Sequence, residues 1–532
     1  MELPKLPSGY KYEANCLYRD GEAISNFIVC PSILYRRQGE SFPFACDLDI
    51  YQGGEIKRIP RTLLNSLTDN WWKNPLPGCW YNPEKRRAAK YLRVIFQNCF
   101  QEVSTIDVIQ ATEIGWLTLP SGDKVYVTGS EVIGEKPDGC TIWLPSTPEK
   151  WVFETAPDCS DEMAMQYFWD LFSLMPGITD ILLVYSFSSF LFPIFQSAGL
   201  RSRFPIILEG ATGSKKTTLA CLTCGAFARQ TNPRSCVVGL TSTHCALEMR
   251  AEQMRHCTLI VDDLFPDGGR TQQEKALKLI RDLFNQDIRE TKSGHALAGS
   301  KMECGIVITA EFFPVCGVST RTRCLRLKLQ APVANSMLQP FQEKAAYLSN
   351  AFLESIRRVA SQYDALIAKI TADFETYRRR RSAENAPAIQ SERLAEIGFF
   401  LFESLDVLLS IFPQEDSNSI LAGFQRRLNN WLDWQLSPEA APDFRDVIFE
   451  IPSIQRQYSG YFKYHHGCWC IQPDELCALL CNRFENYSLD RAYIIKLLRE
   501  RGALMMDESG AATKKIGHQR YLHIIPSRLE RP

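Results

Sequence analysis

The sequence lacks an excess of either sign of charge. Its 532 residues include 60 Lys and Arg against 61 Asp and Glu, which leaves a net charge of −1. Any surface for nucleic acid must therefore be a local patch rather than a global field. Glycine (30) and proline (29) are near average, and no low-complexity tract occurs, which excludes collagen-like, coiled-coil and disordered chains. At 45% hydrophobic residues, the length suits about three domains with apolar cores.

An apolar leader is also missing. The start, MELPKLPSGYKYEANC, has acidic and polar residues where a signal peptide needs an apolar run. Nineteen cysteines, an odd number scattered from Cys16 to Cys481, favour reduced thiols in the cytoplasm over a disulfide framework. The uncharged run 181–200 has the length of a membrane span. Its four serines, its glutamine and Pro193 favour a buried helix instead, so we expect no membrane contact.

The positions of Gly, Pro, Asn and Asp between apolar segments, together with the hydrophobic periodicity of those segments, divide the chain into four domains. Residues 1–155 read mostly as short strands, with helical stretches near 61–72 and 85–101. Residues 331–440 are helical by periodicity and form a lid region. Residues 450–532 predict two helices followed by a two-stranded hairpin, which is the order of a winged helix.

Residues 156–330 begin with helical patterns and then alternate strand-like and helix-like segments. This rhythm is typical of a parallel α/β sheet. The expected strands are 204–208, 236–238, 258–262, 305–309 and 323–329. The predicted fold class is therefore α/β, with a parallel-sheet core, a β-rich N-terminal domain, a helical lid and a C-terminal winged helix.

The strongest motif is FPIILEGATGSKKTTLA at 204–220, an apolar strand that leads through a glycine-bearing loop into a helix. This is the context of a phosphate-binding loop (Walker A), in which N–H groups and the helix dipole hold phosphate oxygens. Lys216 would bridge the β- and γ-phosphates of ATP, and the Thr217 hydroxyl would ligate Mg²⁺. The other nucleotide-binding residues are Gly210, Ala211, Thr212, Gly213, Ser214, Lys215 and Thr218.

One position departs from the pattern G-x-x-x-x-G-K-[ST], because Lys215 stands where the second glycine belongs. A positive φ there would cost a residue with a side chain about 1 kcal/mol or more. Lys215 either adds a second cation for the phosphates or slows turnover. A loop that binds nucleotide without hydrolysis, and an ordinary strand–turn–helix, stay open as alternatives.

Two later strands end in polar residues. CTLIVDDLFP at 257–266 ends in Asp262, which would hold Mg²⁺ through water, and Asp263, which stands where a catalytic base polarises the attacking water. GIVITAEF contains Thr309, which is either a sensor beside the γ-phosphate or a threonine that caps the strand.

The segment STRTRCLRLKL precedes and forms the last expected strand. Either Arg321 or Arg323 would point across a subunit interface as an arginine finger. Arg326 and Lys328 continue at alternating positions, and we interpret them as solvated residues of a strand face.

These motifs in this order resemble the additional-strand P-loop ATPases of the AAA+ and superfamily-3 helicase type. More narrowly, the chain is similar to helicase ATPases of plasmids, prophages and cassette-type integrative elements, whose core is known as domain of unknown function 927. The narrower likeness rests on TEIGWLTLPSGDKVYVTGSEVIG, EGATGSKKTTLA, VGLTSTHCALE, LIVDDLFP and the segment with Arg321 and Arg323.

The resemblance implies a ring-forming ATPase, a hexamer, that uses ATP and Mg²⁺ to move on DNA during replication of a mobile element. In such helicases a hairpin lines the central pore. It lies between the strand that ends in the aspartate pair and the strand that contains Thr309. It would place Lys292, His295 and Lys301 against the phosphates of single-stranded DNA. The alternative is a solvated loop with ordinary charges.

The C-terminal segment is more basic than the chain as a whole. Residues 451–532 carry 12 Lys and Arg against 8 Asp and Glu. A winged helix would set its wing along the backbone of duplex DNA, with Lys514, Lys515 and Arg520 on the wing, although such a domain can equally dock protein. A protein-remodelling or signalling ATPase and a nucleotide-gated scaffold are therefore the rival functions.

Weaker candidates lie elsewhere. The cysteines at 468, 470, 477 and 481 do not have the spacing of a zinc knuckle. Arg393, in the helical region, is a candidate second sensor.

Overall fold

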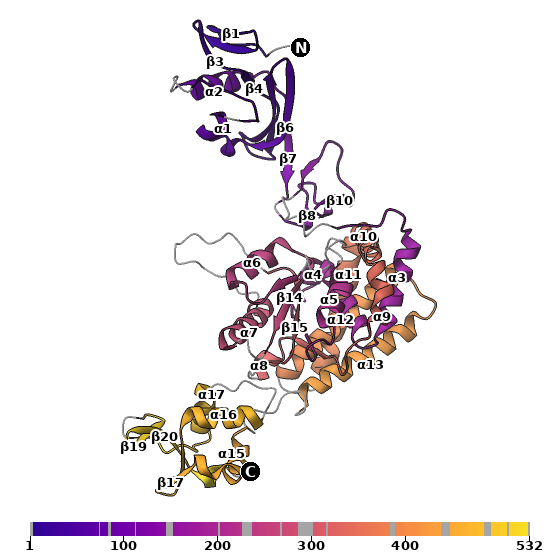
Figure 1. The fold of residues 1–532 in the computed structure, drawn as a ribbon. Coiled ribbons are helices and arrows are strands. Elements are labelled where there is room, and N and C mark those ends of the chain that lie inside the picture. Colours follow the sequence, from indigo (N-terminus) through magenta and orange to yellow (C-terminus); the bar gives the residue numbers. More distant parts are fainter. Residues whose placement is uncertain are drawn as a thin grey trace. The chain divides into compact units, whose positions relative to one another are not determined.

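The computed structural model describes residues 4–73, 75–82, 87–111, 113–144, 153–200, 203–225, 237–265, 269–285, 302–314, 318–383, 389–437, 447–483, 491–507 and 510–529. Lys292, His295 and Lys301 lie outside these ranges, so their contact with DNA stays a prediction. The chain divides into two compact units (Figure 1). The first comprises Met1–Thr112 and Lys136–Pro145, and the second Glu113–Glu135 and Ser146–Pro532.

The first unit is built on a five-stranded sheet of order β11-β7-β4-β5-β6. One face of β4 packs against α2, whose apolar residues Leu92, Ile95 and Phe96 join Trp72 in the core. Its elements are β1 (Tyr10–Glu13), β2 (Cys16–Arg19), β3 (Glu22–Ser25), β4 (Phe27–Arg37), β5 (Pro43–Gln52), β6 (Glu55–Leu63), α1 (Asp69–Lys73), α2 (Ala88–Cys99), β7 (Thr105–Gln110) and β11 (Thr141–Trp143).

The helix expected near 61–72 is wrong in its first half. Arg61 to Leu63 continue β6, and only Asp69–Lys73 is α-helical. Pairing with β5 overrides the local helical pattern, because Thr62 lies opposite Cys46 in the antiparallel register. Arg61 has a φ of 52° at an irregularity in this pairing, where its N–H donates to the Asp47 carboxylate (2.8 Å).

The second unit contains a five-stranded sheet of order β13-β14-β15-β12-β16. All four strand pairs are parallel, as the sequence predicts. The strands are β12 (Ile206–Glu209), β13 (Val237–Gly239), β14 (Thr258–Leu264), β15 (Gly305–Ala310) and β16 (Leu325–Lys328). β15 lies between the strand that precedes the loop and the strand that carries the aspartate pair. Figure 1 shows helices on either side of this sheet, among them α7 on one side and α5 on the other.

The helices of the second unit include a long helical region after β16. They are α3 (Asp161–Leu174), α4 (Thr179–Ser197), α5 (Lys216–Cys224), α6 (His244–Gln253), α7 (Gly269–Asn285), α8 (Val318–Arg321), α9 (Asn335–Glu343), α10 (Ala346–Ser361), α11 (Tyr363–Ala383), α12 (Ile389–Ile411) and α13 (Ser417–Leu436). A small antiparallel sheet of β8 (Gly115–Thr118), β9 (Lys124–Val127) and β10 (Val132–Ile133) precedes them.

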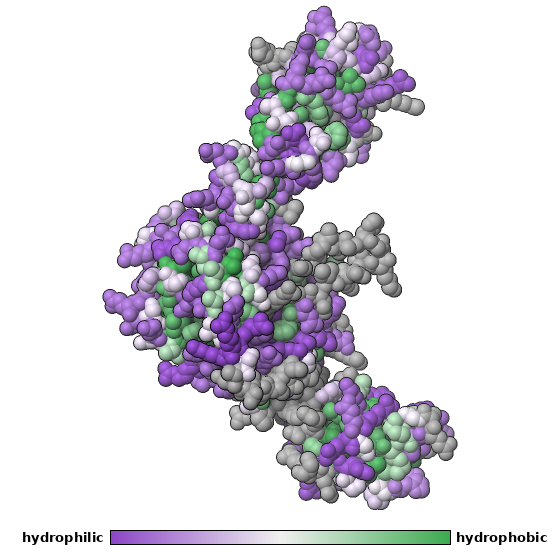
Figure 2. Space-filling model, turned by 180° about the vertical axis from the view of Figure 1, so that it is seen from behind, coloured by the Kyte–Doolittle hydropathy of each residue, from purple (hydrophilic) through white to green (hydrophobic). Residues whose placement is uncertain are grey.

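α4 is long and apolar enough to cross a membrane, yet 89% of its apolar window is buried inside the protein. Its polar groups bond within the core: Tyr185 donates to Phe204 O and accepts from Ile306 N–H (2.8 Å), and Ser189 bonds Thr258 Oγ1 (2.9 Å). The prediction of a buried helix is confirmed. On the face drawn in Figure 2, the coloured surface is mostly hydrophilic, with apolar residues in small patches.

Residues 447–529 have a core of their own, with Ile471, Leu480, Leu498 and Leu522 among its members. Strand, helix, helix and hairpin follow in the predicted order, with the sheet order β17-β18-β20-β19. The elements are α15 (Ile451–Gln457), β17 (Lys463–His465), β18 (Cys468–Ile471), α16 (Pro473–Arg483), α17 (Arg491–Glu500), β19 (Thr513–Ile516) and β20 (Gln519–Ile524).

Candidate functional site

The loop between β12 and α5 lies at the carboxyl edge of the parallel sheet, where open α/β sheets bind their ligands. Both neighbouring strands hold its start. Gly210 N–H donates to Ala310 O (3.1 Å), and Leu329 N–H donates to Glu209 O (2.8 Å). A Cβ on Gly210 would lie 2.7 Å from Ser214 Oγ, so the tight course of the loop requires glycine here.

Lys216 begins α5 and its ammonium group turns back into the loop. Nζ donates to Gly210 O (2.8 Å) and Ala211 O (2.9 Å). Burial lowers the pKa of Lys216, while the carboxylates of Glu311, Asp262 and Asp263 act in the opposite direction. The Lys216 ammonium therefore feels the charges of three carboxylates while it bonds two loop carbonyls.

Lys215 has the backbone conformation that the missing glycine would supply. Its φ is 73° and its ψ is 23°, and it caps α5 at the amino end. A residue with a Cβ in this left-handed region carries a cost of roughly 1–2 kcal/mol. The strain that the sequence predicted for a positive φ is therefore present.

The Asp262 carboxylate joins three elements. Its Oδ1 accepts from Thr217 Oγ1 (2.7 Å) on α5 and from Thr309 Oγ1 on β15. A carboxylate and a hydroxyl are hard oxygen ligands that suit Mg²⁺. The structure thus brings together the two residues expected to hold the metal. Thr309 donates to Asp262, one of these two residues. A threonine that only capped its strand would not need this bond.

Asp263 occupies an irregular position in β14. Its φ is 80°, and the pairing of β14 with β15 shifts between Val261 and Leu264. The backbone is held by Thr309 Oγ1, which accepts the Asp263 N–H (3.3 Å), and by Gln272 Nε2, which donates to Asp263 O (2.6 Å). Burial and the charges of Asp262 and Glu311 raise the pKa of Asp263. Left-handed strain and a raised pKa are both common at catalytic carboxylates.

Sequence reasoning missed a buried ion pair beneath the loop and misassigned one of its members. Arg326, interpreted as solvated, is 3% exposed, and Glu209 is 5% exposed. Arg326 binds both carboxylate oxygens, with Nε 2.6 Å from Oε1 and a terminal nitrogen 3.0 Å from Oε2. Its guanidinium also lies over the rings of Phe313 and Trp434 (4.3 and 5.0 Å to the centroids). The interpretation failed because α13 packs against β16, and the rings of Phe313 and Trp434 cover the guanidinium at this position. Lys328 is exposed, as expected.

The two candidate arginine fingers lie at the other edge of the sheet. Arg321 ends α8 and Arg323 follows it, just before the amino end of β16. Arg323 donates from Nε to Asn285 Oδ1 (3.3 Å) and lies over the ring of Phe284 (5.6 Å). Arg393 also contacts Ser319 (3.3 Å) beside Arg323 rather than the loop.

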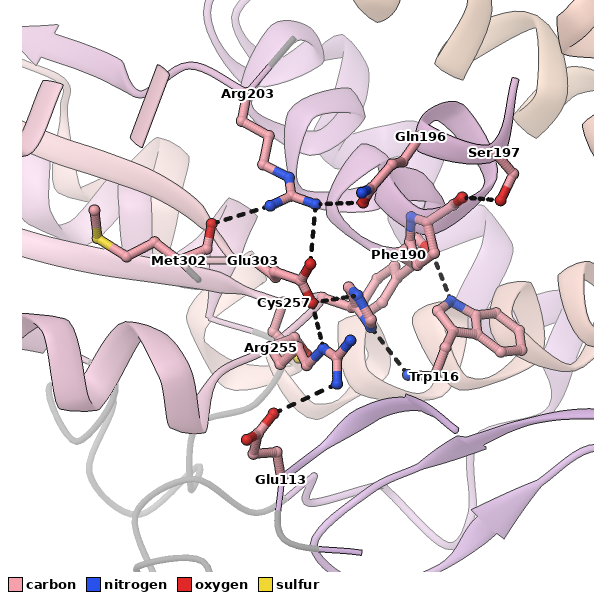
Figure 3. Close-up of polar contacts among 12 residues, drawn as sticks. Glu113, Trp116, Phe190, Gln196, Ser197, Arg203, Arg255, Cys257, Met302 and Glu303 are labelled. Carbon is pink, nitrogen blue, oxygen red and sulfur yellow. Dashed lines mark hydrogen bonds and ion pairs between the residues drawn. The ribbon is translucent and has the colours of Figure 1, made fainter. Parts of the chain in front are cut away.

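A second polar cluster lies at this amino edge, as Figure 3 shows. Glu303 accepts from Arg255 Nε (2.5 Å) and Arg203 (3.4 Å), and its carboxylate lies 3.6 Å from His256 Nε2. Burial lowers the pKa of His256 to about 4. Burial alone would raise the pKa of Glu303, but the bond to His256 and the charge of Arg255 hold it below its usual range.

This cluster attaches the small β8–β9–β10 sheet to the parallel sheet. Trp116 N–H donates to His256 Nδ1 (3.0 Å), and the Trp116 indole donates to Phe190 O (2.7 Å). A Cβ on Gly115 would lie 2.7 Å from both Arg255 O and His256 Nδ1. The Gly-Trp pair of the segment TEIGWLTLP therefore has a packing role.

The described residues contain one cluster that could hold a metal ion. Within them, one group of three His, Cys, Asp or Glu side chains has its ligand atoms within 4.8 Å of one another: His244, Glu248 and Asp282. Among the described residues, the four cysteines of the C-terminal region do not belong to such a group.

The predicted DNA-binding residues of the C-terminal hairpin divide between its two faces. Lys514 lies opposite Tyr521 in the register, and Lys515 lies opposite Arg520. Lys515 and Arg520 are exposed. Lys463 on β17 donates to Tyr521 OH (2.7 Å). None of the residues in β17, β18, β19 and β20 is Asp or Glu, so this sheet is locally cationic.

No protein-family model and no curated protein sequence matches the chain. Among solved structures, it is similar to one described as "SCCmec type IV Cch - active helicase", with a TM-score of 0.58 and 11% identity over 98% of this chain and 99% of that one. A second, "The A form apo structure of NrS-1 C terminal region-CTR", has a TM-score of 0.27 and 10% identity over 92% of this chain and 96% of that one. The first similarity shows that the chain shares a fold with that structure over almost its whole length.

Proposed function

We propose that this chain is an ATP-dependent DNA helicase or translocase with an AAA+-like core. The observation that carries the proposal is the convergence of Lys216, Thr217, Asp262 and Thr309 from three elements at one edge of the parallel sheet. The strand order supports it, because β15 is the additional strand that separates the loop strand from the aspartate strand in such ATPases.

The roles of the residues follow from their positions. Lys216 would leave the loop carbonyls and bind the β- and γ-phosphates, since phosphate oxygens outcompete neutral carbonyls for an ammonium group. Thr217 and Asp262 would hold Mg²⁺, which neutralises charge on the phosphates. Thr309 keeps Asp262 oriented through its hydroxyl. Asp263 would polarise the attacking water, which its raised pKa favours.

DNA is the partner that we propose for this ATPase core. The cationic C-terminal sheet, in a winged-helix arrangement, would bind duplex phosphates through Lys514, Lys515 and Arg520. The pore residues Lys292, His295 and Lys301 would follow a single strand. The structure that shares this fold is described as an active helicase. A hexameric ring of a mobile element, with Arg321 or Arg323 as the finger between subunits, completes the proposal.

Steady-state ATP hydrolysis with and without single-stranded DNA tests this function. The wild type should hydrolyse ATP faster when DNA is present, and Lys216→Ala and Asp263→Asn should each abolish the activity. Lys328→Ala is the matched control, because it removes an exposed lysine from the same sheet. Hydrolysis that is indifferent to DNA would favour a protein-remodelling ATPase, and nucleotide binding without hydrolysis would favour a scaffold.

A further inference from the structure

Glu311 is a carboxylate at the candidate site to which the sequence motifs assign no role. It follows β15 directly and stands two residues after Thr309. Glu311 stands at a bend just beyond the strand that brings Thr309 to Asp262. Its backbone is fixed, because the Glu311 N–H donates to Leu264 O at the end of β14 (2.8 Å).

The side chain of Glu311 reaches into the phosphate-binding loop. One carboxylate oxygen accepts from the Thr212 hydroxyl (2.7 Å), in the middle of the loop. The Lys216 ammonium bonds the carbonyls of the two residues that precede Thr212. Of the carboxylates that act on this ammonium, Glu311 has the largest effect, ahead of Asp262 and Asp263.

These contacts place Glu311 on the γ-phosphate side of the loop. The lysine of a phosphate-binding loop reaches the β- and γ-phosphates, so a carboxylate beside that lysine and the loop centre faces the end of the triphosphate. Asp263, in contrast, is held through its backbone, and its side chain is exposed.

We infer that Glu311 is a catalytic residue, the general base that orients and deprotonates the attacking water. This inference rests on the proposed ATPase function and deepens it. In the step, the water oxygen forms a bond to the γ-phosphorus while the bond from that phosphorus to the bridging oxygen breaks. ADP leaves with the electron pair of the bridging oxygen, and the water proton passes to the Glu311 carboxylate. Asp263 keeps the role proposed above, in which its charge polarises the water, while Glu311 takes the proton.

Single-turnover ATP hydrolysis and ATP binding by Glu311→Gln and Asp263→Asn in the full chain test this assignment. Glu311→Gln should lower the hydrolysis rate by about 100-fold to 10,000-fold, the range for loss of a general base, while the Kd for Mg²⁺–ATP stays within about threefold of the wild type. Glu343→Gln is the matched control, since it makes the same change at an exposed glutamate on α9 and should keep the wild-type rate.

Three results would overturn the assignment in different ways. A Glu311→Gln rate near that of the wild type, with Asp263→Asn inactive, would make Asp263 the base and leave the proposed function intact. A Glu311→Gln variant that no longer binds ATP would make Glu311 a structural residue of the loop. A wild type that binds ATP without hydrolysing it would overturn the proposed function itself, and the role of Glu311 with it.

Discussion

Replacing Glu209 by Gln tests whether a buried ion pair anchors the candidate ATP-binding loop. In the wild type, the Glu209 carboxylate makes two bonds to Arg326 (2.6 and 3.0 Å), and both residues are almost fully buried. The amide keeps the shape of the carboxylate and loses its charge. The guanidinium then remains buried without a counter-charge, which costs about 3–5 kcal/mol.

Hydrogen exchange of peptides from β12 and β16 is the suitable measurement, because it reports the opening free energy of this sheet rather than of the whole chain. Glu209→Gln should lower that free energy by about 3–5 kcal/mol, and ATP binding should weaken with it, since Gly210 follows directly. Replacing the pair together, as Glu209→Leu with Arg326→Met, should restore most of the loss, because no charge is left buried.

The pair Arg36–Asp107 provides the matched control. It has the same two-bond geometry (2.7 and 3.1 Å) with side chains 37% and 50% exposed. Because water screens this exposed pair, Asp107→Asn should lower the opening free energy of its own sheet far less than Glu209→Gln lowers that of the parallel sheet. An equally small loss for Glu209→Gln would refute the reasoning that burial makes the Glu209–Arg326 pair important.

Two further predictions concern backbone strain and acid stability. Lys215→Gly should be more thermally stable than Lys215→Ala by about 1 kcal/mol, because only glycine relieves the strain of a φ of 73°; equal stability of the two variants would contradict this. Burial favours the neutral form of His256 in the folded chain and lowers its pKa from 6.5 to about 4. Between these two pH values, the unfolded chain binds a proton at His256 that the folded chain does not bind. The free energy of unfolding should therefore fall by about 3 kcal/mol as the pH drops through this window, and urea titrations should show a weaker pH dependence for His256→Gln.

Much of the parallel sheet could be predicted because its strands are apolar runs with polar ends. Each expected strand begins and ends within two residues of the observed one. The strand, loop and helix at 204–220 were predictable for a related reason, since they form a local pattern; that this loop binds phosphate stays a prediction. Arg61 shows the opposite case: pairing with β5 decided its conformation, and no local signal showed that partner.

The role of a charged side chain depended on what surrounds it in space. Arg326 looks like a solvated residue in sequence, and only the rings of Phe313 and Trp434 and the carboxylate of Glu209 show that it is buried. Glu311 lies 99 residues from Thr212 along the chain, so no motif spacing joins them.

The sequence by itself determined the elements, the loop and the aspartate pair, because strands, glycine turns and helix starts depend on neighbouring residues. Tertiary structure alone decided which distant groups share the site. Strand order placed β15 between β12 and β14, and this brought Thr309 and Glu311 to the loop. Burial also made Glu209 and Arg326 partners, since a charge excluded from water must find its partner inside the protein.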